Sequence, residues 1–223
     1  MKTALLWWRR RKLEHFVALD GVNLQVGRGE CVALVGRNGA GKSTLLSLIS
    51  RIYRPTSGSI AVNGRIAPLL ELGAGFHPDL TGVENVVFNG IILGLTRKQV
   101  QARMADIVRF AELEHHIDSP VRTYSSGMLA RLGFAVAVHV DADILIVDEV
   151  LAVGDFAFEQ KCYARIEDFR RSGGTILFVS HNMESVRQIA DRCVWLRGGK
   201  VEMEGAPESV ITAYQGDRSE VDL

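Results

Sequence analysis

The sequence predicts an α/β protein in which helices cover the faces of a buried parallel sheet. Apolar runs within 31–35, 143–150 and 175–180 have the composition of strands that are buried on both faces. A glycine-rich segment follows the first run and leads into a helical pattern, an arrangement typical of α/β folds. The stretch from about 81 to 140 is mostly helical in its pattern.

The first part of the chain is expected to supply strands and one helix. Apolar and polar residues alternate over 22–26, which predicts a half-buried strand. Over 43–52 the apolar residues are spaced for one face of a helix. Between 55 and 64, proline, glycine and asparagine separate short segments, which predicts a small antiparallel β region.

The helical stretch at about 81–140 is interpreted as a subdomain inserted into the core. Thr96 is a candidate N-cap for one of its helices, and another helix is expected over 128–140. The later core elements are expected to be helices at 158–171 and 184–191, strands at 175–180, 193–196 and 200–204, and a last helix from Pro207. We therefore expect a single domain over 1–216 and a flexible polar tail over 217–223.

Composition and charge argue against several classes of protein. The 223 residues carry no net formal charge, so the chain as a whole gives no reason to expect a nucleic-acid partner. No apolar run approaches the roughly 18 residues of a membrane-spanning helix. The N-terminal apolar stretch precedes its basic residues, the reverse of a secretory signal. Cys31, Cys162 and Cys193 are too few and too widely spaced for a disulfide framework or a zinc site, so we expect buried thiols in a reducing cytoplasm.

A glycine-rich loop fits the phosphate-binding pattern G-x-x-x-x-G-K-[ST] at every position. Glycines let backbone N–H groups turn toward phosphate oxygens, and the helix N-terminus after the loop favours an anion. Lys42 is expected to reach the β- and γ-phosphates of a nucleotide, and Ser43 to ligate Mg²⁺. The predicted nucleotide-binding residues are Gly36, Arg37, Asn38, Gly39, Ala40, Gly41, Lys42, Ser43 and Thr44. The alternative is a glycine-rich turn with a chance lysine, and the flanking strand and helix argue against it.

Two acids follow the apolar run 144–147. A buried charge is costly unless it is paired or bound to a metal, so Asp148 is expected to hold Mg²⁺. Glu149 is expected to act as general base toward the attacking water. The alternative is a strand end that runs into solvent. His181 follows another predicted strand, at the edge where ligands bind in an open parallel sheet, and is expected to donate a hydrogen bond to the γ-phosphate.

Residues 124–128, Tyr-Ser-Ser-Gly-Met, open a predicted helix ahead of the acidic strand. They resemble the LSGGQ-type signature of ABC ATPases, and the order of glycine loop, signature, acidic strand and histidine agrees with that family. Asp155 matches the aspartate of the family's D-loop. The resemblance implies a P-loop NTPase (RecA-like) core with an antiparallel β subdomain and an inserted α-helical subdomain.

The resemblance also implies that two such domains meet head to tail around two ATP molecules. The residues that would act across this interface are Ser125, Ser126, Gly127 and Met128. Because one chain carries both complementary halves, a second copy of itself is the expected partner. Ser126 replaces the usual first glycine of the signature and Met128 the usual glutamine. Serine keeps a small hydroxyl donor, so activity is still expected.

Two further roles are assigned from the resemblance with alternatives. The glutamine that the family carries between core and helical subdomain is absent from 69–82, where Glu71 is the candidate equivalent and His77 the alternative. Adenine stacking is assigned to Phe16, with Trp7 or Trp8 as alternatives. Each aromatic is equally compatible with covering a sheet edge.

More narrowly, segments 69–82, 124–128 and 150–155 resemble the ATPases that export O-antigen, teichoic acid or capsular glycans. That resemblance implies a membrane permease, expected in two copies, and a lipid-linked glycan as cargo of the complex. The chain is expected at the cytoplasmic face of the inner membrane as a peripheral subunit. It ends before the C-terminal carbohydrate-binding domain that some members carry, so a short form is expected.

Three alternatives stay open. The exporter could carry another cargo, such as a drug or a lipid, or the chain could be a soluble ABC ATPase without a transport role. Another P-loop class, such as a kinase or GTPase, would leave the signature and His181 without a function. The run 7–12, Trp-Trp-Arg-Arg-Arg-Lys, is compatible with contact to anionic lipid headgroups and with a solvated face beside an edge strand.

Overall fold

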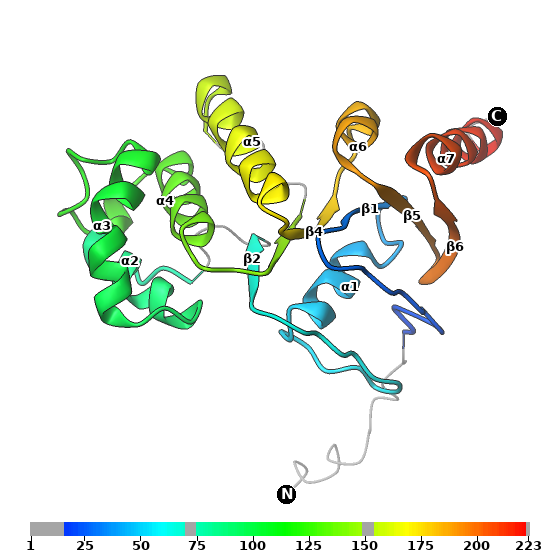
Figure 1. The fold of residues 1–223 in the computed structure, drawn as a ribbon, viewed down its shortest axis with the longest axis horizontal. Coiled ribbons are helices and arrows are strands. Elements are labelled where there is room, and N and C mark those ends of the chain that lie inside the picture. The colour runs from blue at the N-terminus through cyan, green and yellow to red at the C-terminus, as the bar shows by residue number, and fades with distance from the viewer. Residues whose placement is uncertain (1–15, 70–74, 149–153, 222–223) are drawn as a thin grey trace, which may run out of the picture.

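The computed structural model describes residues 16–69, 75–148 and 154–221, and a six-stranded sheet forms its centre (Figure 1). The strands are β1 (Cys31–Val35), β2 (Ile66–Leu69), β3 (Ile144–Val147), β4 (Thr175–Val179), β5 (Arg192–Arg197) and β6 (Lys200–Gly205). Their order is β2-β3-β4-β1-β5-β6, and all neighbours are parallel except β5 and β6. The carboxyl ends of the five parallel strands therefore lie along one edge of the sheet.

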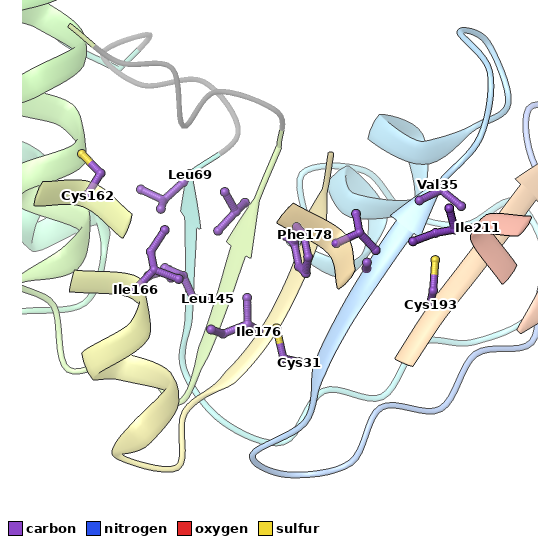
Figure 2. Close-up of a cluster of buried hydrophobic side chains, with 14 of the residues drawn as sticks. Cys31, Val35, Leu69, Leu145, Cys162, Ile166, Ile176, Phe178, Cys193 and Ile211 are labelled. Atoms are coloured by element: carbon purple, nitrogen blue, oxygen red, sulfur yellow. The ribbon is translucent and has the colours of Figure 1, made fainter. Parts of the chain in front are cut away.

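Helices cover both faces of the sheet (Figure 1). The four helices are α1 (Lys42–Ile49) on one face and α5 (Phe156–Arg171), α6 (Met183–Ile189) and α7 (Pro207–Val221) on the other. Leu46 of α1 packs in the same buried cluster as Leu34 of β1. Figure 2 shows the opposite face, where Cys31 of β1 and Ile166 of α5 contribute to a second cluster. Every residue of β1 is at most 1% exposed, as its uninterrupted apolar run predicts.

A separate group of helices lies between β2 and β3 in the chain and forms one end of the molecule in Figure 1. Its members are α2 (Gly82–Ile92), α3 (Arg97–Ala111), the short 3-10 helix η1 (Val121–Thr123) and α4 (Ser126–Val138). Val86, Ile107 and Leu132, one from each longer helix, belong to its own buried cluster. Thr81 and Thr96 close capping boxes at α2 and α3, which confirms the N-cap predicted at Thr96.

Two segments for which the sequence predicts short strands, 22–26 and 55–64, form no strand in this structure. Within the described residues neither segment has a ladder partner, so the alternation over 22–26 survives only as alternate half-buried and exposed side chains. The two segments border a cavity of about 680 Å³ beside α1. The nearby β2 instead pairs with β3 in the parallel sheet, where Ala67 and Leu69 are buried.

The C-terminal helix and the burial of the three cysteines were also predicted from the sequence. Helix α7 continues to Val221, and Asp217 pairs with Arg197 of β5 at 3.0 Å. Residue 217, where the polar tail is predicted to begin, thus lies within α7 and is joined to β5 by this ion pair. All three cysteines are buried and unpaired, as expected. Burial raises the pKa of each thiol to about 12, which makes the thiols poor nucleophiles.

Candidate nucleotide-binding site

The predicted glycine loop connects the buried end of β1 to the first turn of α1. Gly36, Gly39 and Gly41 adopt φ angles of 152°, 80° and 103°, which favour glycine. A Cβ on Gly36 would collide with the carbonyl oxygen of Leu196, and one on Gly41 would lie 2.7 Å from Cδ2 of Leu19. The path of the loop therefore depends on glycine at these two positions.

The Lys42 side chain lies inside this loop and is only 7% exposed. Its Nζ donates to the carbonyl oxygens of Gly36 at 2.7 Å and Arg37 at 3.1 Å. These hydrogen bonds compensate for the burial of the ammonium group. Arg37, Asn38 and Gly39 are exposed, so a fixed positive charge lies beneath an open rim. Such an arrangement suits a phosphate group.

Ser43 and Asp148, the two residues predicted to hold Mg²⁺, are in contact. Ser43 lies in the first turn of α1, Asp148 directly follows β3, and the Ser43 Oγ donates to the Asp148 Oδ2 at 3.0 Å. Hydroxyl and carboxylate oxygens are ligands that Mg²⁺ prefers, so this pair fits the metal. Glu149, the predicted general base, lies outside the described residues.

The order of the strands places His181 between these groups. Strand β4 lies between β1 and β3, with Val147 paired to Phe178. His181 follows β4 and is exposed at the same edge from which the glycine loop and Asp148 emerge. An ammonium, an imidazole and a carboxylate therefore come from the ends of three adjacent parallel strands, the position where ligands bind in open α/β sheets.

The predicted signature lies at the N-terminus of α4, in the helical group. Ser125 is the N-cap, and its Oγ accepts a hydrogen bond from the backbone N–H of Met128 at 3.2 Å. Ser125 and Ser126 are exposed, while Gly127 is half-buried. An exposed helix N-terminus that carries hydroxyls favours an anion. The signature and the glycine loop lie on different parts of the chain, one in the helical group and one on the sheet (Figure 1).

Asp155, the predicted D-loop residue, is the N-cap of α5. Its Oδ1 accepts from the backbone N–H of Phe158 at 3.0 Å, and its Oδ2 accepts from Arg131 at 2.7 Å. The Phe158 hydrogen bond and then the nearby Arg131 charge lower the pKa of Asp155. Arg131 was not predicted as a site residue. Its signal in the sequence is that it is the only charged residue over 126–138.

The loop that leads into α2 is held by a buried amide. The Asn85 side chain is fully buried; its Nδ2 donates to the carbonyl oxygens of His77, Leu80 and Thr81, and its Oδ1 accepts from the His77 N–H at 2.7 Å. This role of Asn85 was not predicted either. The sequence does carry a signal for it, since Asn85 is an amide within a largely apolar helix. Glu71, the first candidate for the family's glutamine, lies outside the described residues.

The remaining candidates are less constrained. Phe16 is 86% exposed, so its ring covers little of the sheet, while Trp7 and Trp8 lie outside the described residues. Among the residues that the structure describes, no cluster of three or more His, Cys, Asp or Glu could hold a metal ion. None of the helices described there is long and apolar enough to cross a membrane.

Sequence comparisons identify relatives of the chain. A family model described as ABC transporter matches residues 19–152. The O-antigen export system ATP-binding protein RfbB of Myxococcus xanthus is 53% identical over 219 residues, 96% of this chain and 50% of that protein. A protein of the same name from Klebsiella pneumoniae is 54% identical over 200 residues, 90% of this chain and 81% of that protein. The chain thus spans half the length of one relative and most of the other.

Solved structures share the fold. The ATP binding subunit of an ABC transporter superposes with a TM-score of 0.78 at 26% identity, covering 89% of this chain and 87% of that one. The cassette MJ0796, described as a dimeric post-hydrolysis state bound to ADP and Pi, gives a TM-score of 0.73 at 24% identity, covering 85% and 90%. These likenesses confirm the α/β core predicted from the sequence.

Proposed function

The chain belongs to the ABC transporter family, and from this premise we propose that it hydrolyses ATP to power the export of a lipid-linked cell-surface polysaccharide. The cargo would cross the inner membrane through a separate permease. Two relatives that are more than half identical are named as O-antigen export ATP-binding proteins, which supports this class of cargo. Residues 1–216 would form one ATPase domain, with the helical subdomain at about 81–140.

One observation carries the ATPase proposal. The buried Lys42, the exposed His181 and the Ser43–Asp148 contact at 3.0 Å come together at the carboxyl ends of β1, β4 and β3. A chance glycine turn would not explain why Asp148, which is 105 residues away in the chain, contacts Ser43, the residue after the lysine. The convergence supports a site for a phosphate chain with its metal.

Each group has a distinct task in this proposal. The loop residues 36–44 bind the phosphates of ATP, and Lys42 neutralises their charge. Ser43 and Asp148 would hold Mg²⁺, which supplies further charge neutralisation when bound. Glu149 accepts a proton from the attacking water, and His181 donates a hydrogen bond to the γ-phosphate. The products are ADP and phosphate.

The active assembly is proposed to be a homodimer. Ser125 caps an exposed helix N-terminus that is suited to an anion, yet its helix packs in the cluster of the helical group, whereas α1, which follows the glycine loop, packs in a cluster of the sheet. A second copy arranged head to tail would place Ser125–Met128 of one protomer against the ATP of the other. The cassette MJ0796, which shares the fold, is described as dimeric.

The permease is proposed to contact α2 and the loop before it. Phe88, Ile91 and Ile92 of α2 are 49%, 47% and 62% exposed, although they are large and apolar. Exposed apolar side chains that are grouped on one helix mark interaction surfaces. Two permease copies, matching the two ATPase copies, would hold the chain at the cytoplasmic face of the membrane.

The dimer is tested with Glu149→Gln, which should trap ATP without hydrolysis. We expect this variant to sediment as a dimer with Mg²⁺ and ATP and as a monomer with ADP. Adding Lys42→Ala to it should abolish dimerisation, because the loop then loses its cation. A Glu149→Gln protein that stays monomeric with saturating ATP would count against the ABC mechanism.

The cargo is tested in cells whose only copy of the chain carries Lys42→Ala. Polyprenyl-linked glycan should accumulate on the cytoplasmic side, and its composition would identify the sugar. A normal surface glycan without accumulation would refute polysaccharide export and leave the ATPase proposal standing. Another cargo, such as a drug or a lipid, would then be the better reading.

A further inference from the structure

A cluster of four charges joins α3, α4 and α5. Arg131 of α4 donates to Glu112 Oε2 at 2.8 Å and to Asp155 Oδ2 at 2.7 Å. Lys161 of α5 contacts the other carboxylate oxygen of Glu112 at 3.2 Å. One guanidinium thus connects the residue that ends α3 with the residue that caps α5.

The Arg131 side chain is held in one orientation. It is 17% exposed, and its Cζ lies 4.7 Å from the ring centroid of Phe158, which is itself buried. A Cβ on Gly154 would lie 2.8 Å from the Arg131 Nε, so the backbone beside Asp155 also closes over the guanidinium. A planar group with several fixed donors can serve two carboxylates at once, which a lysine ammonium does less well.

We propose that Arg131 is a positioning residue that makes the signature end of α4 and the segment around Asp155 move as one unit. Ser125 caps the helix that carries Arg131, and Asp155 caps α5 while it binds Arg131. Neither helix N-terminus can shift alone without breaking this ion pair. The contact therefore couples two elements that are distant in the sequence.

This inference rests on the proposed function, in which the signature of one protomer reaches the ATP of its partner. The segment that Arg131 holds follows Glu149, the proposed base, along the chain. Closure of the dimer at the signature would then be transmitted through Arg131 to Asp155, which comes after Glu149 in the chain. ATP binding to the glycine loop does not use this contact, since the loop connects β1 and α1.

The first test is ATP hydrolysis by the full chain carrying Arg131→Met. We expect kcat to fall about 10- to 100-fold, because small misplacements of reacting groups cost up to two orders of magnitude. The affinity for ATP should change by less than about twofold, since binding to the loop is untouched. The kcat of Arg131→Lys should lie between that of Arg131→Met and that of the unmodified chain. Gly154→Ala, which crowds the guanidinium but keeps its charge, should also lower kcat.

The second test does not depend on ATP. Asp155 accepts the backbone N–H of Phe158 at 3.0 Å, so the hydrogen exchange of that amide reports whether Asp155 is held in place. We expect faster exchange at Phe158 in Arg131→Met than in the unmodified chain. Unchanged exchange would overturn the positioning role, even if the unmodified chain proved to have no ATPase activity and the proposed function failed.

Arg103→Met is the matched control. Arg103 is 29% exposed, contacts Asp141 at 2.7 Å and belongs to the same helical group. Its loss should lower stability while kcat and Phe158 exchange change by less than about twofold. An equal fall of kcat in Arg103→Met and Arg131→Met would overturn the proposal, because it would indicate general destabilisation. So would a normal kcat in a folded Arg131→Met protein.

Discussion

The sheet and the helical group hold their candidate functional residues in different ways. In the sheet, Lys42, Asp148 and His181 follow strands that are almost wholly buried, and their positions result from apolar packing on both faces. In the helical group, Arg131 joins α4, the helix that carries the signature, to Asp155, and the hydrogen bonds of the Asn85 side chain hold the loop before α2. Apolar packing distributes its stabilising free energy over many side chains, whereas a polar network depends on the one side chain at its centre. Substitutions should therefore act differently in the two regions.

The largest effect is expected in the sheet, at the Ser43–Asp148 contact. Asp148→Ala should reduce ATP hydrolysis by about 100-fold or more, because it removes a carboxylate proposed to hold the metal that neutralises the transferred phosphate. Chelation of Mg²⁺ should stop hydrolysis by the unmodified chain. Steady-state rates over a Mg²⁺ titration provide the measurement.

Asp106→Ala serves as the control for that experiment. Asp106 is exposed on α3 and pairs with Arg109 at 3.3 Å. It is not one of the residues proposed to bind ATP or Mg²⁺. Its rate should match that of the unmodified chain. If Asp148→Ala hydrolysed ATP normally at low Mg²⁺, the metal assignment would be wrong, and the contact would have only a structural role.

The next largest effect is expected where the two regions meet. Phe134 of α4 is fully buried, and its ring centroid lies 5.9 Å from that of Phe110 in α3 and 6.4 Å from that of Phe158 in α5. Phe134→Ala should lower the free energy of unfolding by about 3–5 kcal/mol, through lost burial and the cavity left behind. Denaturant unfolding, followed by circular dichroism, measures this loss.

The shape of that unfolding curve sharpens the comparison. A single transition would mean that the helical group and the sheet unfold together, and a second transition would mean that the helical group has its own stability. Phe88→Ala, at a residue that is 49% exposed on α2, should cost less than about 1 kcal/mol. Equal losses of unfolding free energy in Phe134→Ala and Phe88→Ala would show that Phe134 does not join the helical group to the sheet region.

The sequence was informative wherever burial is continuous. The apolar runs predicted β1, β3 and β4. The residue types after these runs predicted Ser43 and Asp148 as separate ligands of Mg²⁺, and the structure shows the two side chains in contact. Strand β2 was missed as a member of this sheet, since Pro68 interrupts its pattern. Proline is tolerated at a sheet edge, and β2 is the edge strand.

The helical group was predicted as helices but not in its polar contacts. The pattern of a single sequence shows that Thr96 can cap a helix, because its partner Gln99 lies within the same turn. It does not show that Arg131 meets Glu112 and Asp155, because those residues approach only after α3, α4 and α5 have packed. Contacts within one turn are thus predictable, and contacts between packed helices are not.

A moderate effect is expected at the buried amide of the helical group. Asn85→Ala should lower the free energy of unfolding by about 1–3 kcal/mol, because it leaves the backbone N–H of His77 and the carbonyl of Leu80 without this partner. Asn89→Ala is the control, since Asn89 is only half-buried on the same helix and should cost less. Thermal unfolding of both variants measures the difference. A smaller loss for Asn85→Ala than for Asn89→Ala would show that the amide does not organise this loop.

The smallest effect is expected at a polar contact inside the sheet region, which is the exception to its apolar packing. Glu30 precedes β1; its Oε1 accepts from Arg192 Nε at 2.6 Å and its Oε2 from the Gly27 N–H at 2.7 Å. The Arg192 hydrogen bond, helped by that from Gly27, lowers the pKa of Glu30 below its ordinary value of 4.5. The folded state therefore favours the ionised carboxylate. Its contribution is present above pH 4.5 and is lost as the pH falls through the lowered pKa.

Glu30→Gln should thus destabilise the chain by on the order of 1 kcal/mol near neutral pH, the size of a partly exposed ion pair. The difference from the unmodified chain should shrink as the pH falls below 4.5, because the unmodified carboxyl is then protonated too. Urea unfolding of both proteins over this pH range provides the measurement. Glu84, at the start of α2, is the corresponding carboxylate in the helical group, since hydrogen bonds from Thr81 lower its pKa too. The same urea measurement on Glu84→Gln compares the two regions. A difference for Glu30→Gln that stayed constant with pH would mean that Glu30 stabilises the sheet through packing and not through its charge, and the contrast between the two regions would then hold even here.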